Sequence, residues 1–259
     1  MAKTKNIRIK KKYGQHFLRS TSVLRTIFDA VDLNDKSSVF EIGCGDGFLT
    51  QAILEHSCAR LWVFEIDPEW ANFVKKNIRD SRLTIFLENI LDVDFIQFEK
   101  YKPWILLANL PYQITFPILH LLQLNRALLE EGVIMVQEEV AQKIVKTGGR
   151  GYGFLSLFFQ HYFEWQLLDK IPPSAFLPPP KVYSRLMYFK PKQEVQYIPE
   201  EQKFWKFIKM CFRQPRRTLR NNLQQAHFDL SKLSDEQLVL RAQQMNMNDL
   251  LGIWDAVRK

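Results

Sequence analysis

The stretch that decides the fold runs from Val39 to Gly47 and reads VFEIGCGDG. A short apolar run of strand-forming residues leads directly into a turn with three glycines, and helix-like residues follow it. In an open α/β sheet such a turn lies at the carboxyl ends of the strands, where ligands bind. We therefore expect this loop to line a ligand site.

The composition of the glycine loop narrows the class of ligand. Its spacing is GxGxG instead of GxGxxG, and it carries Glu41 and Asp46 but no Lys or Arg. A pyrophosphate needs main-chain N–H groups and few nearby anions. The loop therefore suits a small ligand with positive charge, and a nicotinamide oxidoreductase is disfavoured.

Outward from this loop, strand-like runs alternate with helix-like runs. The strand-like runs are residues 39–42, 61–66, 83–87, 104–108 and 133–136, and the helix-like runs are residues 23–31, 69–78, 116–129 and 138–146. This alternation predicts an α/β fold with an open, Rossmann-like parallel sheet that helices cover on both faces.

Beyond residue 148 the pattern changes. Residues 154–163 are aromatic-rich, residues 171–181 carry five prolines and predict a stiff loop, and residues 184–189 predict a strand that we place at the sheet edge. From residue 191 only helical patterns remain. We therefore divide the chain into a domain of residues 1–190 and a small all-helical domain of residues 191–259.

The overall composition bounds the class of protein. Of the 259 residues, 46% are apolar and 13% aromatic, which excludes disorder of the whole chain. Three separated cysteines, without a CxxC pair or a His cluster, disfavour a disulfide scaffold and a metal site. The sequence shows no signal-peptide core and no apolar run of membrane-spanning length. We expect a soluble, cytoplasmic protein, and a monomer because no long apolar stripe is left over.

The net charge of +8 is concentrated at the two ends of the chain. Residues 1–36 hold nine basic and three acidic side chains, residues 190–259 hold thirteen and eight, and the middle has a net charge of −3. Cationic ends fit contacts with a polyanion such as RNA, although solvated surface charge explains the same counts. The candidate RNA-binding residues are Lys10, Lys11, Lys12, Arg213, Arg216, Arg217 and Arg220.

Two further strand ends carry polar side chains. Glu65 lies eighteen residues beyond Gly47, where an acid accepts hydrogen bonds from both ribose hydroxyls. Asn89 follows the next strand, in a position that faces a nucleobase edge. With the glycine loop, these ends predict a site for the amino-acid part, the ribose and the adenine of S-adenosyl-L-methionine. The alternatives are a tight turn without a ligand and an ordinary polar loop residue.

The most informative tetrad is Asn109-Leu110-Pro111-Tyr112, which follows the strand-like residues 104–108. Methylation of the exocyclic amine of adenine is difficult because the nitrogen lone pair is delocalised into the ring. Two acceptors on the amine hydrogens stabilise the positive charge that develops. The side-chain carbonyl of Asn109 and the main-chain carbonyl of Leu110 can supply them, and Tyr112 offers a ring face for an extruded base.

Six motifs occur in order along essentially the whole chain. They are residues 13–18 (YGQHFL), 41–45 (EIGCG), 65–67 (EID), 109–112 (NLPY), 174–182 (SAFLPPPKV) and 216–223 (RRTLRNNL). Together they resemble the ribosomal RNA adenine N6,N6-dimethyltransferases, in particular the small-subunit (16S) rRNA branch. The resemblance implies a class I S-adenosylmethionine-dependent methyltransferase sheet, with a catalytic domain and basic arm in residues 1–190 and a helical RNA-binding domain in residues 191–259.

The resemblance also implies roles for single residues. The implied cofactor-binding residues are His16, Leu18, Gly43, Gly45, Glu65, Asn89 and Asn109. Asn109, Leu110 and Tyr112 act at the target base, and Phe176 forms the wall opposite Tyr112. The implied substrate is a pair of adjacent adenosines in the 3′-terminal hairpin of small-subunit rRNA, within a precursor of that subunit.

Two positions depart from the family pattern. Asn89 stands where the family more often has Asp, so we expect somewhat weaker cofactor binding. Pro215 stands where another cation is common. Without it, the four arginines from Arg213 to Arg220 would share one helical face, but Pro215 must break or kink that helix unless it starts a new one.

Two other functions stay open at this point. One is an enzyme of the same chemistry that dimethylates large-subunit rRNA and confers antibiotic resistance. The other is a non-catalytic assembly factor that uses the same surface to bind and time ribosome maturation. The aromatic residues Phe204, Trp205, Phe207 and Phe212 fit either RNA contact or core packing of the helical domain.

Overall fold

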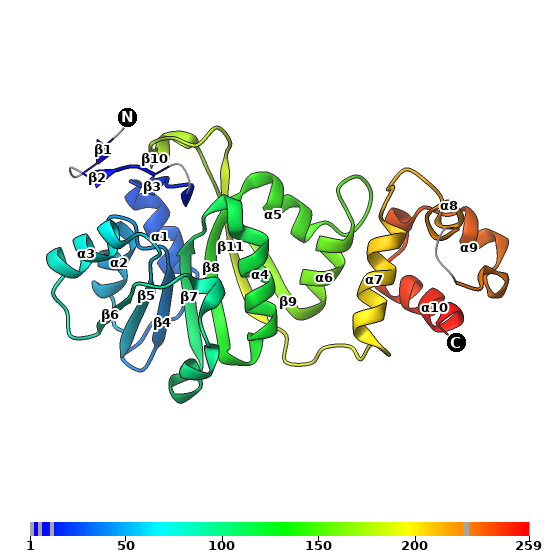
Figure 1. The fold of residues 1–259 in the computed structure, drawn as a ribbon, viewed down its shortest axis with the longest axis horizontal. Helices are drawn as coiled ribbons and strands as arrows, with labels where there is room; N and C mark the ends of the chain where they lie inside the picture. The colour runs from blue at the N-terminus through cyan, green and yellow to red at the C-terminus, as the bar shows by residue number, and fades with distance from the viewer. Residues whose placement is uncertain (1–2, 5–6, 11–12, 225–227, 259) are drawn as a thin grey trace. The chain divides into compact units, whose positions relative to one another are not determined.

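The computed structural model describes residues 3–4, 7–10, 13–224 and 228–258 of the chain. Its contacts divide the chain into two compact units. The first comprises Met1–Ala141 and Glu164–Pro191, and the second comprises Gln142–Phe163 and Lys192–Lys259. Figure 1 shows the helices and strands of both units.

The first unit is built on a seven-stranded sheet with the strand order β6-β5-β4-β7-β8-β11-β9 (Figure 1). Neighbours from β6 to β8 are parallel, and β11 is antiparallel to β8. The strands are β4 (Ser38–Ile42), β5 (Arg60–Phe64), β6 (Leu83–Phe86), β7 (Trp104–Asn109), β8 (Leu129–Gln137), β9 (Phe163–Ile171) and β11 (Ser184–Pro191). The predicted α/β fold with a Rossmann-like sheet is confirmed.

The strand order reverses at β4. This strand pairs with β5 on one side and with β7 on the other. The chain therefore moves outward through β5 and β6 and then returns to the opposite side of β4. Loops that leave neighbouring strands in opposite directions open a crevice at the carboxyl ends of these strands.

The two faces of β4 pack against different partners. All five residues of the strand are buried, as expected for a sheet that is covered on both faces. Successive side chains point to opposite faces. Val39 belongs to a core cluster with Leu49 and Ile53, whereas the ring of Phe40 packs edge-on against Phe98.

The helices of the first unit include one that begins at a side-chain cap that the sequence supplies. They are α1 (Thr21–Asp29), α2 (Phe48–Leu54), α3 (Pro68–Asn77), α4 (Thr115–Leu124) and α5 (Glu138–Val145), and α5 ends in the second unit. At α3, Asp67 accepts a hydrogen bond from the main-chain N–H of Glu69 at 3.1 Å. Pro68 at the first helical position has no N–H that needs a partner.

Short paired strands connect the N-terminus to the proline-rich segment. β3 (Phe17–Leu18) pairs antiparallel with β10 (Phe176–Leu177), and the two lie side by side in Figure 1. A second short pair joins β1 (Lys3–Thr4) to β2 (Ile7–Arg8). The predicted stiff loop of residues 171–181 therefore contains a two-residue strand.

The predicted position of the sheet edge was wrong. β11 lies between β8 and β9, and β9 is the edge strand. The aromatic-rich run contains a helix, α6 (Phe154–Tyr162), and β9 begins at the next residue. Without Gly, Pro or Asn between them, the sequence carries no turn signal that separates the helix from the strand.

The second unit is helical. Its helices are α6, α7 (Glu201–Cys211), α8 (Leu219–Leu223), α9 (Asp235–Val239) and α10 (Met247–Val257). The ring of Trp205 packs on Phe158 and Tyr162 of α6, at centroid distances of 5.0 and 6.1 Å. The four aromatic residues that fit either RNA contact or core packing, Phe204, Trp205, Phe207 and Phe212, are all buried, which favours core packing.

The two units differ from the predicted domains. The first unit ends at Pro191, but residues 142–163 pack with the C-terminal helices because α6 supplies rings to the core around Trp205. The functions assigned to the two predicted domains remain predictions. Within the described residues, no helix is both long and apolar enough to span a bilayer.

Candidate active site

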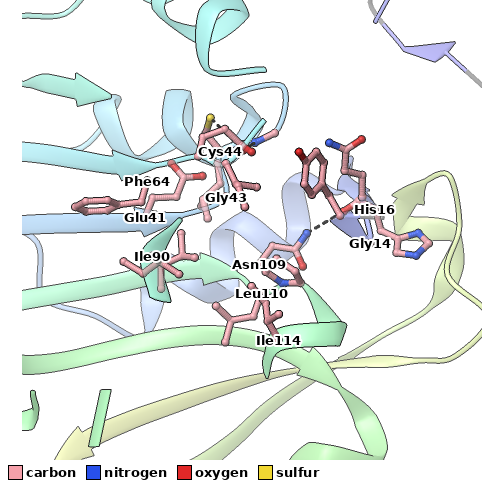
Figure 2. Close-up of a pocket in the computed structure, with 18 of the residues that line it drawn as sticks. Gly14, His16, Glu41, Gly43, Cys44, Phe64, Ile90, Asn109, Leu110 and Ile114 are labelled. Carbon is pink, nitrogen blue, oxygen red and sulfur yellow. Dashed lines mark hydrogen bonds between the residues drawn. The ribbon is translucent and has the colours of Figure 1, made fainter. Parts of the chain in front are cut away.

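A cavity of about 320 Å³ lies at the carboxyl ends of β4, β5, β6 and β7. Figure 2 shows side chains from these strand ends and from the N-terminal segment around it. Its lining includes all seven predicted cofactor-binding residues: His16, Leu18, Gly43, Gly45, Glu65, Asn89 and Asn109. Leu110 also lines the cavity, whereas Tyr112 and Phe176 do not contribute to its lining.

The N-terminal segment, which we define as Lys10 and Tyr13–Arg19, forms one wall of this cavity. Tyr13–Leu18 line it. The ring of Phe17 lies so close to Gly45 that a Cβ atom there would meet two ring carbons at 2.7 Å. Gly45 also has a φ of +52°, which favours glycine. The segment and the glycine loop are thus in direct contact.

Glu65 is held in place by main-chain donors. Its Oε2 accepts from the N–H of Gly45 at 3.0 Å, and its Oε1 accepts from the N–H of Asp67 at 2.8 Å. Burial raises the pKa of the Glu65 carboxyl, and these two hydrogen bonds oppose the rise. Oε2 also accepts from the thiol of Cys44 at 3.7 Å, whereas Oε1 keeps a second lone pair, so Glu65 can still accept from a ligand hydroxyl.

Glu41 lies deeper in the same cavity wall. Its Oε2 accepts a hydrogen bond from the hydroxyl of Thr50 at 2.6 Å. Complete burial raises the pKa of Glu41 to about 8, and the neighbouring charge of Glu65 adds to this effect. A cation bound in the cavity would lower that pKa again because it stabilises the ionised form.

The described part of the cavity lining is acidic. It contains Glu41, Asp46, Glu65 and Glu88, and no Lys or Arg among the described residues that line it. Asp46 also pairs with Arg19 at 2.7 Å, just outside the cavity. Such a lining repels phosphate groups and attracts a small cationic ligand.

The amide of Asn109 has a defined orientation. Its Nδ2 donates to the main-chain carbonyl of His16 at 2.9 Å, and Figure 2 shows this bond. Since the partner is a carbonyl, the atom that faces it must be the nitrogen. The Oδ1 atom accepts no hydrogen bond from the described residues and is available to a ligand.

The main-chain carbonyl of Leu110 provides a second open acceptor. The N–H of Leu110 donates to the carbonyl of Met135 at 3.1 Å, which continues the contact between β7 and β8. Its carbonyl oxygen, in contrast, accepts no hydrogen bond within the described part of the chain. Pro111 then turns the chain, with a φ of −59°, into the short 3₁₀ turn Tyr112–Ile114.

The ring of Tyr112 lies beside the cavity. It stacks on the ring of His16, with the centroids 5.9 Å apart and the planes at 25°. Its hydroxyl is hydrogen-bonded to the hydroxyl of Ser184. Burial raises the pKa of the Tyr112 phenol, and this hydrogen bond opposes the rise. The contacts with His16 and Ser184 hold the Tyr112 ring in one orientation beside the cavity.

Phe176 occupies a different environment from the one we predicted. It is 4% exposed and belongs to the core cluster with Leu18 and Ala175. Because β10 pairs with β3, the side chain of Phe176 is directed into the core. The structure therefore does not present this ring to a base opposite Tyr112, and the stacking role of Phe176 stays a prediction.

Asn89 uses its side chain locally as well as lining the cavity. Its Oδ1 accepts from the N–H of Leu91 at 3.2 Å, and its Nδ2 donates to the carboxylate of Asp92 at 2.8 Å. The oxygen has a second lone pair, which can accept from an adenine amine. This amide cannot rotate without losing both bonds, so its orientation is fixed.

The basic N-terminal candidates are only partly described. Lys10 is bonded to the carboxylates of Asp67 and Glu69, and the distance to Asp67 is 2.7 Å. Its ammonium group is thus committed to α3, which does not fit the predicted RNA contact. Lys11 and Lys12 lie outside the described residues.

The C-terminal arginines do not share a helical face. α7 ends at Cys211 and α8 begins at Leu219, so Pro215 lies in the loop between two helices. Arg213, Arg216 and Arg217 are exposed in this loop, and Arg220 is in α8, where it pairs with Asp235 at 2.6 Å. Among the described residues, neither the guanidinium of Arg216 nor that of Arg217 has a hydrogen-bond or ion-pair partner.

Sequence reasoning missed the role of Asp67 and Gln15. Gln15 donates to Asp67 at 2.9 Å and accepts from the main-chain N–H of Lys10 at 2.8 Å. The pair Asp67-Pro68 does carry a helix-start signal, which predicts the cap of α3. The partnership with Lys10 has no local signal because 57 residues separate the two side chains.

The comparisons with known proteins agree with this geometry. A family model described as ribosomal RNA adenine dimethylase matches residues 6–252. The chain belongs to the ribosomal RNA adenine dimethylase family. It is therefore a methyltransferase enzyme of the rRNA adenine dimethyltransferase type, and the family named from the six motifs is confirmed.

Individual relatives extend over nearly the whole chain. The ribosomal RNA small subunit methyltransferase A of Prosthecochloris aestuarii is 34% identical over 253 residues, which are 97% of this chain and 95% of the relative. The protein of the same name from Syntrophotalea carbinolica is 37% identical over 220 residues, covering 84% and 83%.

Solved structures support the fold. A dimethyladenosine transferase from Plasmodium falciparum has a TM-score of 0.79 at 22% identity and covers 93% of this chain and 98% of its own. The 23S rRNA methyltransferase ErmE has a TM-score of 0.67 at 20% identity and covers 94% and 100%.

Within the described residues, no group of three or more His, Cys, Asp or Glu side chains could hold a metal ion.

Proposed function

We propose that the enzyme transfers methyl groups from S-adenosyl-L-methionine to N6 of two adjacent adenosines in the 3′-terminal hairpin of small-subunit (16S) rRNA. The product is N6,N6-dimethyladenosine, formed during biogenesis of the small ribosomal subunit. The observation that carries this proposal is the pair of open acceptors at the end of β7, the Oδ1 of Asn109 and the carbonyl of Leu110.

The lining of the cavity fits S-adenosyl-L-methionine, which when bound supplies a methyl group on a cationic sulfur. Glu41 and Asp46 would face its cationic amino-acid part. Glu65, already oriented by two main-chain N–H groups, would accept from the ribose hydroxyls. Asn89 would accept from the adenine amine through its oriented Oδ1.

The two acceptors explain how the chain favours attack by an adenine amine. An amine held by the Oδ1 of Asn109 and the carbonyl of Leu110 loses conjugation with its ring, and both oxygens stabilise the positive charge that develops on nitrogen. No strong base is needed, because the proton leaves after the new N–C bond has formed. After the first methylation one hydrogen remains, so one of the two acceptors loses its partner in the second transfer.

The substrate we propose is the precursor of the small ribosomal subunit, bound in the cytoplasm by one copy of the chain. The exposed Arg216 and Arg217 supply unpaired cations for phosphate contacts. The names of the two relatives above point to the same subunit.

The test is transfer of labelled methyl groups to unmethylated small and large ribosomal subunits, presented separately. The proposal predicts label in small-subunit rRNA alone. Label in large-subunit rRNA would favour the resistance-type dimethyltransferase. If the protein bound small subunits but neither bound the cofactor in calorimetry nor transferred label, the assembly-factor function would replace the proposal.

A further inference from the structure

Asp67 joins the cofactor side of the sheet to the N-terminal segment. Its side chain is fully buried, and its Oδ1 accepts from the ammonium group of Lys10 at 2.7 Å. Its Oδ2 accepts from the amide of Gln15 at 2.9 Å. Both donors belong to the N-terminal segment, and this buried carboxylate binds the two of them at the start of α3.

The same residue also contacts the candidate ribose acid. The main-chain N–H of Asp67 donates to the Oε1 of Glu65 at 2.8 Å. Glu65 lines the cavity from the sheet, whereas Gln15 and His16 line it from the N-terminal segment. Asp67 therefore lies between two walls of one cavity and is bonded to both.

Helix capping alone does not explain this arrangement. A helix cap needs one side-chain oxygen. At α3 this oxygen is the Oδ1 of Asp67, which accepts from the N–H of Glu69 at 3.1 Å, so capping does not involve Oδ2. A buried carboxylate is costly unless it is paired and fully hydrogen-bonded. Lys10 and Gln15 supply that pairing, and Glu69, which also bonds Lys10, has a side chain that is 51% exposed.

The N-terminal segment has other attachments from His16 onward. The main-chain carbonyl of His16 accepts from Asn109, and its Nδ1 is hydrogen-bonded to the carbonyl of Pro178. The ring of Phe17 packs against Trp70 of α3. Arg19 pairs with Asp46, and Phe17–Leu18 pair with β10. Residues Tyr13–Gln15, which line the cavity, lie between these attachments and Lys10. Loss of the Asp67 contacts would thus free one end of the cavity wall.

We propose that Asp67 is a positioning residue for cofactor binding, whose charge holds Lys10 and Gln15 so that the N-terminal segment closes the cavity. This inference rests on the proposed function, because it takes the cavity as the site of S-adenosyl-L-methionine. Asp67 touches no atom of the reacting groups and acts through the segment that it holds.

The Asp67→Asn variant isolates this role from the cap. Asn caps helices as well as Asp and has the same size, but it carries no charge for Lys10. Glu69→Gln is the matched control, since it removes the exposed carboxylate on Lys10 and leaves Asp67 intact. Lys10→Gln removes the partner from the other side.

The first measurement is calorimetric binding of S-adenosyl-L-methionine to the full chain without RNA. A hydrogen bond to a charged group predicts that Asp67→Asn weakens binding about tenfold or more, and that Lys10→Gln weakens it similarly. The double variant should be no weaker than the poorer single variant, because both changes break one contact. Glu69→Gln should stay within about twofold of the unaltered protein, and the KM for the cofactor should rise in Asp67→Asn with kcat preserved.

The second measurement is hydrogen exchange of residues 13–18 without cofactor. Asp67→Asn should increase exchange there, with the melting temperature close to that of the unaltered protein. Unchanged cofactor affinity in Asp67→Asn, or an affinity lost only together with a large fall in melting temperature, would overturn the proposal. If the unaltered protein bound no cofactor, the proposed function would fail as well, whereas loss of the exchange effect alone would leave that function intact.

Discussion

The side-chain amide of Asn109 donates to the main-chain carbonyl of His16 at 2.9 Å, across the mouth of the cavity. One hydrogen bond therefore does two things. It connects the end of β7 to the N-terminal segment, and it turns the Oδ1 of Asn109 away from that segment, where no described residue donates to it. The oxygen is oriented before any substrate arrives.

Asn109→Ala removes this acceptor. We expect kcat for rRNA methylation to fall by about 10²- to 10³-fold, as for loss of one oriented group that stabilises developing charge. RNA binding should remain nearly intact. Single-turnover methylation and filter binding of unmethylated small subunits would measure the two effects.

Asn109→Ala also removes the hydrogen bond to His16, so the two roles of Asn109 must be separated. If Asn109→Ala lost cofactor affinity and kept its turnover at saturating cofactor, Asn109 would act through the N-terminal segment and not as the acceptor. A variant that kept most of its turnover under all conditions would contradict the assignment of the tetrad.

Alanine at Gly45 and at Gly43 should have different effects on stability. Both glycines have positive φ, so each substitution costs about 1 kcal/mol of folding free energy or more. A Cβ at Gly45 would also meet the ring of Phe17 at 2.7 Å, whereas a Cβ at Gly43 meets nothing within 4 Å. Gly45→Ala should therefore lower the free energy of unfolding by roughly 1–3 kcal/mol more than Gly43→Ala, and it should have the lower melting temperature of the two.

The cofactor affinities of the two glycine variants should not follow the order of their stabilities. Gly43 lines the open cavity, so its new methyl group would occupy space meant for the ligand. We expect both variants to lose cofactor affinity in calorimetry, although only Gly45→Ala is strongly destabilised without ligand. Equal melting temperatures would show that Phe17 does not rest on Gly45 in solution.

Glu41 should make the free energy of unfolding depend on pH. Burial raises its pKa to about 8 in the folded protein, from 4.5 for an ordinary Glu. Between these values the folded state binds one proton more than the unfolded state, so stability falls as pH rises through this window and levels off above it. Glu41→Gln, which has no charge at any pH, should flatten that slope.

Urea unfolding at several pH values from about 5 to about 9 covers most of the window between the two pKa values and the plateau above it, and it measures this difference. Titrating groups that do not interact with Glu41 contribute equally to both proteins and cancel in the comparison. A slope in Glu41→Gln as steep as in the unaltered chain would place the titration elsewhere.

The loop arginines should govern the salt dependence of RNA binding. Replacing Arg216 and Arg217 together by Gln should reduce the slope of log affinity against log salt by about 2, which is one phosphate contact each. Arg220→Gln is a matched control, since Arg220 is already paired with Asp235. A larger loss from Arg220→Gln than from the loop pair would contradict this assignment.

Much of the cavity followed from the sequence because it is built at strand ends. The glycine loop, Glu65, Asn89 and Asn109 each come directly after an apolar run, and parallel strands bring their carboxyl ends to one edge of the sheet. Local sequence patterns were therefore sufficient to predict these residues. The order of the strands was the one further feature needed to bring them together.

The features that the sequence did not predict depend on contacts between distant residues. In the sequence Lys10 is one of several cations in a basic arm, but in the structure it forms an ion pair with the buried carboxylate of Asp67. Phe176 follows a segment rich in proline, yet strand pairing with Phe17–Leu18 directs it into the core. β9 was missed because α6 runs into it without a turn residue. Burial and strand pairing between distant residues produce no pattern in the sequence around each residue.

The most direct test of the account identifies the modified nucleotides themselves. Unmethylated small subunits are incubated with the enzyme and S-adenosyl-L-methionine, and the rRNA is cut into fragments and analysed by mass spectrometry. The account predicts N6,N6-dimethyladenosine at two adjacent positions of the 3′-terminal hairpin. Adenosines with one methyl group only, or methyl groups at any other position, would contradict it.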